Sequence, residues 1–185
     1  ATIGTNGVVT GVSAGTSVIS YTMPGGCAAT QTVTVNTSAN SLNFDGTNDY
    51  VVLPTGLTAS YTDFTFEAWV YPTSNTAWRR IMDFGSGTTV NMFLTSSYNG
   101  AGIPRFAITT GGTAGEQQLT SSTAMPLNTW SHIAVTINGA TNTGTLYLNG
   151  NVVATNAGMT LDPSSLGSLS NNWLGRSQYA DPYFI

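Results

Sequence analysis

Apolar and other side chains alternate along the segment 64–70, which reads Phe-Thr-Phe-Glu-Ala-Trp-Val. Segment 132–137 repeats the pattern, with isoleucine or valine at every second position from Ile133. Successive side chains of a strand point to opposite faces, so this period places the apolar set of each segment on a core. We therefore predict two strands of an antiparallel sheet with one buried face and one mixed face.

Two hairpins are predicted where such runs are joined by turn residues. In the first, 146–148 and 152–153 flank an Asn-Gly dipeptide at 149–150, which accepts the positive φ angles of a type I′ turn. In the second, 104–110 and 116–119 flank a glycine-rich turn. No amphipathic helix longer than a turn or two fits the sequence, so the pattern favours an all-β fold.

The chain is predicted to have two β-rich parts of unequal length. Short alternating runs between residues 7 and 35 are separated by Gly and Asn. Residues 37–41 are small and polar, which is typical of a linker. We therefore predict a partial β domain at 1–36, a linker at 37–41 and a larger domain at 42–185.

Composition excludes two classes of partner. Of the 185 residues only 6% are charged, none is lysine, and the net charge is -4. Because there is no basic run or face to follow a phosphate backbone, we expect no nucleic-acid partner. No apolar stretch approaches the roughly 20 residues that span a bilayer, so we expect no membrane insertion.

The sequence offers little for catalysis. Glu67 and Glu116 are the only glutamates, and neither has another acid two or three positions away. General acid-base chemistry requires groups placed together, so both are interpreted as partners of an arginine or a backbone amide. The single histidine, His132, cannot form a histidine-based metal cluster and is interpreted as a packed, hydrogen-bonded side chain.

Five sequence motifs follow one another along the chain, at 42–50, 64–70, 129–136, 146–150 and 172–183. Together they resemble the laminin-G-like jelly-roll modules of the concanavalin A-like lectin/glucanase superfamily, over about four-fifths of the chain. Further motifs at 80–85, 104–109 and 115–117 are similar to modules attached to secreted bacterial glycoside hydrolases and adhesin-like surface proteins. The resemblance implies an antiparallel jelly-roll β-sandwich.

The resemblance also bears on function. Retaining glucanases of this superfamily use a Glu-x-Asp-x-x-Glu strand motif, which this sequence lacks. We therefore expect a non-catalytic carbohydrate-binding or adhesion module of a large secreted or cell-surface bacterial protein, with a polysaccharide or glycan surface as partner. Two alternatives stay open: an accessory module of a glycoside hydrolase whose catalytic domain is outside this chain, and a structural spacer without ligand.

Sugar recognition needs flat aromatic faces together with planar polar groups that bridge hydroxyls. Loop-like segments supply candidates of these types: Trp78, Arg79, Tyr98, Trp173, Arg176 and Tyr179. For Trp78 and Tyr98, the sequence is equally consistent with an exposed and with a buried side chain. Trp69 and Trp130 lie in strand motifs and are expected in the core. Arg80, Arg105 and Arg176 are as consistent with pairing to Glu116, Asp83 or Asp181 as with ligand contact.

Relatives of this kind often hold calcium at the rim of the sandwich, with carboxylate and carbonyl ligands. Asp45 and Asp49 have the spacing of loop ligands and are the candidate calcium ligands here. The alternative, which we favour, is that Asp45 caps an Asp-Gly turn. The Asp-Glu pair that normally follows in the final strand of the family is absent from this sequence. The family continues beyond Ile185 with that strand, which pairs beside 42–44, so we expect an unpaired edge there.

The first 36 residues resemble the second half of a bacterial immunoglobulin-like domain, and a generic β-meander is the alternative. Domains of that kind often carry a second cysteine near their start. This resemblance suggests that Cys27, the sole cysteine, pairs with an upstream cysteine absent from this chain. The alternative is that Cys27 is a small buried hydrophobic residue.

Overall fold

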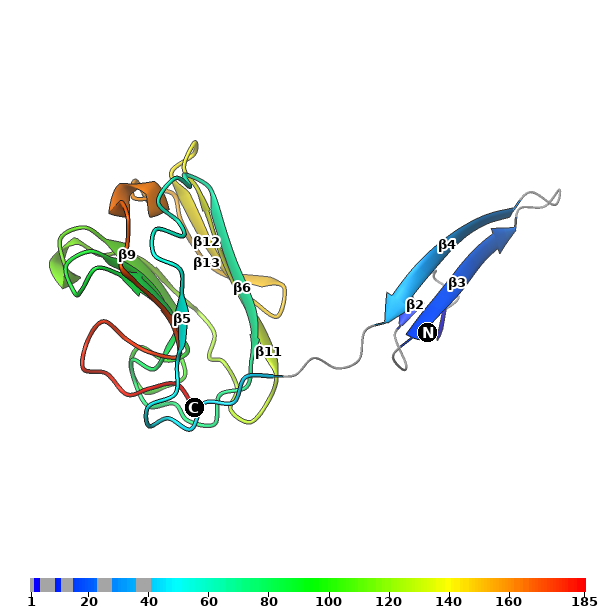
Figure 1. Cartoon of the computed structure of the whole chain (residues 1–185), viewed down its shortest axis with the longest axis horizontal. Coiled ribbons are helices and arrows are strands. Elements are labelled where there is room, and N and C mark those ends of the chain that lie inside the picture. The colour runs from blue at the N-terminus through cyan, green and yellow to red at the C-terminus, as the bar shows by residue number, and fades with distance from the viewer. Residues whose placement is uncertain (1, 4–8, 11–14, 23–27, 36–40) are drawn as a thin grey trace. The chain divides into compact units, whose positions relative to one another are not determined.

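The structure, a computed structural model, describes residues 2–3, 9–10, 15–22, 28–35 and 41–185 (Figure 1). It divides into two compact units, Ala1–Leu42 and Asn43–Ile185.

The first unit contains two antiparallel strand pairs. β3 (Gly15–Thr22) pairs with β4 (Ala28–Val35) along the whole of both strands, and β1 (Thr2–Ile3) pairs with β2 (Val9–Thr10). The likeness to an immunoglobulin-like domain stays a prediction. Cys27 and most of the predicted linker lie outside the described residues, so the disulfide of Cys27 also stays a prediction.

The second unit is a β-sandwich of two antiparallel sheets, as predicted. The six-stranded sheet has the order β10-β9-β8-β7-β14-β5 and the four-stranded sheet the order β13-β12-β11-β6 (Figure 1). Their bounds are β5 Val51–Leu53, β6 Phe64–Val70, β7 Arg80–Gly85, β8 Asn91–Thr95, β9 Arg105–Thr109, β10 Gln117–Thr120, β11 Ser131–Asn138, β12 Thr143–Leu148, β13 Asn151–Asn156 and β14 Asn171–Leu174. Among the described residues the helical segments are two single 3-10 turns, η1 (Thr113–Gly115) and η2 (Pro163–Leu166).

Both predicted hairpins form. β12 and β13 are joined through Asn149 and Gly150, whose φ angles of 51° and 77° are those of a type I′ turn. β9 and β10 pair around the glycine-rich turn that contains η1. The side chain of Asn149 also accepts a hydrogen bond from the backbone N–H of His132, which ties the turn to β11.

The core lies between the sheets and is built by the predicted alternation. Val135 on β11 is opposite Phe66 on β6 and Leu146 on β12, and all three point inward. The six-stranded sheet contributes a matching layer of Met82, Phe84, Met92, Leu94, Phe106, Ile108 and Leu119. The two apolar layers are what hold the sandwich together.

The central strands of the six-stranded sheet, β7, β8 and β9, are also buried on their outer face. All five residues of β8 are buried, although Met92 and Leu94 alone occupy its inward positions. The outer side is covered by loops: Trp78 N–H donates to the Ser97 carbonyl, and Gln178 N–H donates to Asp83. A polar layer therefore lies between this sheet and the loops that cover it.

One expectation about the early strand is wrong. Residues 42–44 form no strand, and β5 at Val51–Leu53 is the edge of the six-stranded sheet instead. Phe44 turns its ring edge-on to Phe184, with ring centroids 6.2 Å apart. The chain then turns at Gly46, where φ is 77°. Aromatic packing against the C-terminal segment has taken the place of strand pairing.

The expectation that Trp69 and Trp130 lie in the core is also wrong. Their side chains are 65% and 50% exposed. Trp69 alternates with Ala68 and Val70, which face the core, so its indole stands on the outer face of β6. There it packs on His132 at 5.4 Å, and Trp130 packs on Tyr71 at 5.5 Å.

Gly175 is predicted to be a sensitive position, because it combines a φ of +84° with a close neighbour. A Cβ added there would lie 2.8 Å from Cε1 of Phe44, whereas at Gly150, with φ +77°, it would meet nothing within 4 Å. Gly150→Ala should lower the free energy of unfolding only by the strain of a left-handed backbone at a non-glycine residue, about 1–2 kcal/mol. Gly175→Ala should cost about 1–3 kcal/mol more from overpacking. Urea denaturation measures both losses, and equal losses would contradict the contact.

A second prediction concerns the exposed tryptophan. Trp69→Ala should lower the free energy of unfolding only by about the 0.5–1.5 kcal/mol of an aromatic pair. Phe106→Ala, at a side chain that is 0% exposed, should lower it by about 3–5 kcal/mol. The two variants are compared by chemical denaturation. Comparable losses would mean that the Trp69 indole is packed.

Candidate functional site

A pocket on the outer face of the six-stranded sheet gathers aromatic and charged side chains. Strand alternation places Phe93 on this face, between the inward Met92 and Leu94, and its partner Asp83 in β7 is on the same side. The pocket has a volume of about 160 Å³. It is lined by Trp78, Arg80, Phe93, Thr113, Glu116, Tyr179 and Asp181.

Arg80 lies at the base of the pocket and is only 2% exposed. Its Nε contacts Asp83 Oδ2 at 3.2 Å, its Nη2 contacts Asp181 Oδ2 at 3.1 Å, and its Nη1 donates to the Trp78 carbonyl at 3.0 Å. The guanidinium also stacks over the Phe93 ring, 3.9 Å from its centroid. Arg80 thereby fixes the loops that carry Trp78 and Asp181 onto the sheet.

Asp83 is the buried partner beneath Arg80, and it is 0% exposed. Its Oδ2 also accepts the backbone N–H of Gln178 at 3.0 Å, while Oδ1 is buried without a hydrogen-bond partner. Burial raises the pKa of Asp83 to about 6, against the opposing effects of Arg80 and the Gln178 N–H.

Trp78 is held in a strained backbone conformation at the pocket wall. Its φ of 68° lies in the left-handed region, which is unusual for a bulky residue, and its N–H donates to the Ser97 carbonyl at 2.7 Å. Its ring meets those of Phe93 and Tyr98 edge-on, with centroids 6.3 and 6.1 Å away. Arg105 stacks on Tyr98 at 3.7 Å and supports this aromatic wall.

Three polar side chains of the lining, Tyr179, Glu116 and Asp181, are anchored to the protein by hydrogen bonds. The Tyr179 hydroxyl donates to the Thr88 carbonyl at 2.9 Å, and burial raises the pKa of this phenol. Glu116 Oε2 accepts from the Gln118 side chain at 2.7 Å. Asp181 Oδ2 accepts from the Ser177 hydroxyl at 2.8 Å. Each carboxylate is held through one oxygen.

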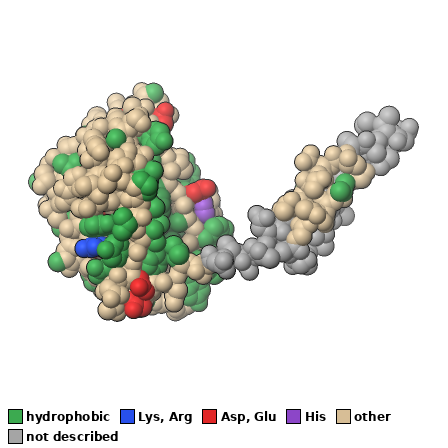
Figure 2. All heavy atoms as spheres, viewed as in Figure 1, with side chains coloured by type: hydrophobic (Ala, Val, Ile, Leu, Met, Phe, Trp, Pro, Cys, Tyr) green, Lys and Arg blue, Asp and Glu red, His purple; other side chains and the backbone are tan. Residues whose placement is uncertain are grey.

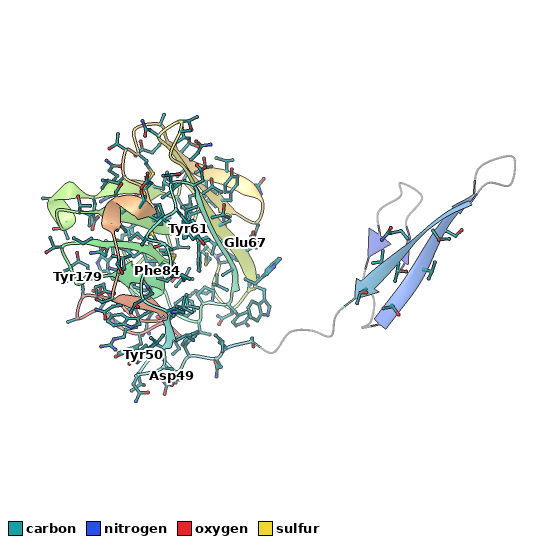
Figure 3. All side chains as sticks on the ribbon, turned by 45° about the horizontal axis from the view of Figure 1, so that its top comes forward. Asp49, Tyr50, Tyr61, Glu67, Phe84 and Tyr179 are labelled. Carbon is teal, nitrogen blue, oxygen red and sulfur yellow. The ribbon has the colours of Figure 1, made fainter. Side chains whose placement is uncertain are left out.

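Trp173 and Arg176 belong to a second cluster, away from this pocket. The Arg176 guanidinium stacks on Trp173 at 4.2 Å and on Tyr50 at 4.6 Å, and Tyr50 also packs on Tyr183. Figure 3 shows Tyr50 and Tyr179 well apart on the same unit.

Arg79 points into neither cluster. Its Nη1 donates to the carbonyl of Tyr183, and its Nε is buried without a partner. Desolvation lowers the pKa of Arg79 from its ordinary value. Arg79 therefore attaches the C-terminal segment to the sandwich and does not line the pocket.

The structure brings together three of the six sugar-binding candidates: Trp78 and Tyr179 line the pocket, and Tyr98 supports it. Sequence reasoning left Phe93, Thr113, Glu116 and Asp181 out of the site. For Glu116 and Asp181 the sequence provided a partial indication, because both were possible ion-pair partners of an arginine. It provided none for Phe93 and Thr113. The ion-pair alternative for Arg80 is confirmed, because it contacts both Asp83 and Asp181.

Glu67 was interpreted as the partner of an arginine or a backbone amide, but in the structure it faces His132 instead. Glu67 Oε2 lies 3.5 Å from His132 Nε2, across the outer face of the four-stranded sheet. In Figure 3, Glu67 and Tyr179 are on opposite sides of the unit with Phe84 between them. The Glu67 carboxylate thus has no part in the pocket.

Asp45 and Asp49, the candidate calcium ligands, share one exposed loop. Asp45 Oδ1 accepts from Thr47 N–H at 2.7 Å, which is the capped turn that we favoured, and Asp49 Oδ2 accepts from Asp45 N–H at 3.1 Å. Among the described residues no three His, Cys, Asp or Glu side chains are placed together for a metal ion. Two carboxylates fit calcium only if backbone carbonyls complete the set, so calcium stays a prediction.

A larger cavity of about 410 Å³ opens at one edge of the sandwich, between β5 and β6. It is lined mainly by apolar side chains: Leu53, Leu57, Tyr61, Phe64, Phe66, Phe84 and Leu174, with Thr58, Asp63 and Thr65. Figure 2 shows hydrophobic side chains gathered in a band along this edge. The cavity is a gap at the margin of the core and lacks the convergent polar groups that orient a hydrophilic ligand.

Comparison with known proteins settles the family. The model of the concanavalin A-like lectin/glucanases superfamily matches residues 45–185. The chain belongs to this superfamily. A search of curated protein sequences finds no significant match.

Solved structures show the fold of this superfamily member in other proteins. Domain 4 of an extracellular arabinanase from Geobacillus stearothermophilus, solved with arabinotriose, is 16% identical and aligns over 91% of this chain and 70% of that one, with a TM-score of 0.59. The CBM40 module of a Ruminococcus gnavus sialidase, solved with α2,3-sialyllactose, is 16% identical over 74% of this chain and 85% of that one, with a TM-score of 0.56. At this identity the likeness concerns the fold.

Within the described residues, no helix of this superfamily member has the length and apolar character to cross a bilayer.

The raised pKa of Asp83 predicts how stability depends on pH. The folded state binds this proton more readily than the unfolded state, so the contribution is fully present below the unfolded pKa of 3.8 and is lost as the pH rises through about 6. The stability of the protein relative to Asp83→Asn should therefore fall as the pH rises through that window and level off above it. Urea denaturation of both proteins at several pH values measures the difference. A constant difference across the window would contradict the prediction.

Proposed function

We propose that the unit formed by Asn43–Ile185 is a non-catalytic carbohydrate-binding module, with its ligand in the pocket above Arg80. The observation that carries the proposal is the half-buried Trp78 ring, which lines a mainly aromatic pocket beside the polar side chains of Thr113, Glu116 and Asp181. Membership of the concanavalin A-like lectin/glucanases superfamily supports it, as do structural neighbours solved with oligosaccharides.

The chemistry of the walls suits a sugar. An aromatic face covers the apolar C–H side of a sugar ring, and carboxylates and hydroxyls exchange hydrogen bonds with its hydroxyl groups. Trp78 supplies the ring, and Thr113, Glu116 and Asp181 supply the polar groups. The left-handed backbone of Trp78 is strain of the kind that often accumulates at ligand sites.

The volume limits how much ligand the pocket encloses. At about 160 Å³ it is smaller than the roughly 300–1,000 Å³ of pockets that enclose drug-sized ligands. We therefore propose that it accepts a single residue of a glycan, with the rest of the ligand lying across the surface.

The cluster of Trp173 and Arg176 is a second proposed contact for such a ligand. The Arg176 guanidinium stacks on two aromatic rings, which fix the orientation of its plane of N–H donors. Little further side-chain freedom would therefore be lost when a ligand binds to it. A longer glycan chain could meet this cluster only after leaving the pocket, so its contribution should depend on chain length.

The carboxylates of the pocket favour binding over hydrolysis. Retaining glycosidases need two carboxyl groups about 5–5.5 Å apart, one as nucleophile and the other as acid and base. Asp181 Oδ2 is bound to Arg80 and to Ser177, so this carboxylate is already part of the protein's own ion-pair network. The module is accordingly proposed to bind its ligand without cleaving it.

The parent protein is proposed to be a secreted or cell-surface bacterial protein. Two of the structural neighbours are modules of bacterial carbohydrate-active enzymes, one of them extracellular. The same observation favours the second candidate role, an accessory module that holds a glycoside hydrolase on its substrate. Both roles need the pocket to bind glycan, whereas a structural spacer does not.

The test is to measure retention of the chain on a glycan array and on immobilised polysaccharides. Trp78→Ala and Tyr179→Ala should each weaken binding at least tenfold, which corresponds to about 1.4 kcal/mol. Trp69→Ala removes an equally large ring from the opposite face of the sandwich and is the matched control. It should leave binding unchanged.

Melting temperatures of the same variants separate binding from folding. Trp78 and Tyr179 are half-buried, so a modest loss of stability is expected beside the loss of binding. Loss of stability with binding retained would assign both rings to packing. Retention of no glycan by the unaltered chain would favour the structural spacer.

A further inference from the structure

We infer that the pocket above Arg80 selects neutral sugar residues and excludes residues that carry a carboxylate or sulfate group. The inference rests on the proposed function and specifies its ligand. It follows from the balance of charge around the pocket, which is set by residues from four separate parts of the chain.

The one guanidinium that lines the pocket is already neutralised. Arg80 contacts Asp83 and Asp181 through different nitrogens, donates from the third to the Trp78 carbonyl, and has one face covered by Phe93. An arginine that binds the carboxylate of a ligand presents its two-nitrogen fork to it. In Arg80 every nitrogen of the guanidinium is engaged with the protein.

Carboxylates outnumber cations around the pocket. Glu116 and Asp181 line it, and Asp83 is directly beneath Arg80. The other nearby cation, Arg105, stacks on Tyr98 and donates to the Thr120 hydroxyl, with its guanidinium 5.9 Å from the Trp78 ring centroid. A negatively charged ligand group would therefore meet unfavourable charge in a partly desolvated site.

The same carboxylates favour neutral hydroxyl groups. Glu116 contacts the protein through Oε2, and Asp181 contacts it through Oδ2. The other oxygen of each carboxylate has no hydrogen-bond partner among the described residues. A carboxylate only accepts hydrogen bonds, so it pairs with O–H donors and rejects groups that are themselves acceptors only. Sugar hydroxyls are such donors, whereas the carboxylate of a uronic or sialic acid is not.

The experiment compares matched oligosaccharides that differ only at C6. Galactose and galacturonate trisaccharides form one pair, and glucose and glucuronate trisaccharides form another. In any pair that binds, the neutral member should bind at least tenfold more tightly, as measured by calorimetry. The preference should shrink as salt is added, because screening weakens the repulsion.

Glu116→Gln tests the cause of the preference. It removes one negative charge, while its amide oxygen still accepts from Gln118, so the preference for the neutral member should fall several-fold. Glu67→Gln removes a charge from the opposite face and should leave the preference unchanged. This pair of variants separates local charge from net charge.

Each outcome bears on a different claim. Equal or tighter binding of the acidic members, or an unchanged preference in Glu116→Gln, would overturn the inference and leave the proposed function standing. Binding of no glycan from either class would overturn the proposed function, and the inference with it.

Discussion

Arg80 holds the outer layer of the sandwich onto the six-stranded sheet. A buried guanidinium is costly to remove from water unless its hydrogen bonds and charge are satisfied. Here one carboxylate comes from the sheet itself, Asp83, and another from the C-terminal loop, Asp181, while the carbonyl comes from the loop at Trp78. Two loops that are about a hundred residues apart in the sequence are thus joined through a single side chain.

The two sheets of the sandwich differ because of this layer. The central strands β7, β8 and β9 of the six-stranded sheet are buried on both faces, so their outer side chains are fixed by neighbours before any ligand arrives. The four-stranded sheet leaves its outer face open, and there Trp69 and Trp130 lie against single neighbours. Aromatic rings are present on both faces, but on the six-stranded sheet they line a pocket together with carboxylate and hydroxyl groups. Such preorganisation is what reduces the entropy cost of binding.

The chain contains no lysine, and its four arginines are used for structure as much as for charge. Arg79 donates to a backbone carbonyl, Arg80 forms the buried network, and Arg105 and Arg176 stack on aromatic rings. A planar guanidinium can stack and donate at the same time, which an ammonium group cannot. In a chain with so few charges, each arginine therefore contributes more through geometry than through its field.

The sequence by itself determined the strands, the hairpins and the inner core. The alternation at 64–70 and 132–137 and the Asn-Gly turn at 149–150 are local patterns, and a period of two assigns side chains to two faces of a strand. It also supplied Trp78 and Tyr179 as residue types suited to sugars. Tertiary structure decided which faces are covered. Trp69 was expected in the core because it lies in a strand motif, although the alternation at 64–70 puts it on the mixed face. Alternation cannot say whether that face is covered, and here it stays bare, while the central strands of the other sheet are covered by loops. The sequence offered Asp181 only as one of three possible partners for three arginines. Its contact with Arg80 depends on how a long C-terminal loop folds back, and no local pattern encodes that.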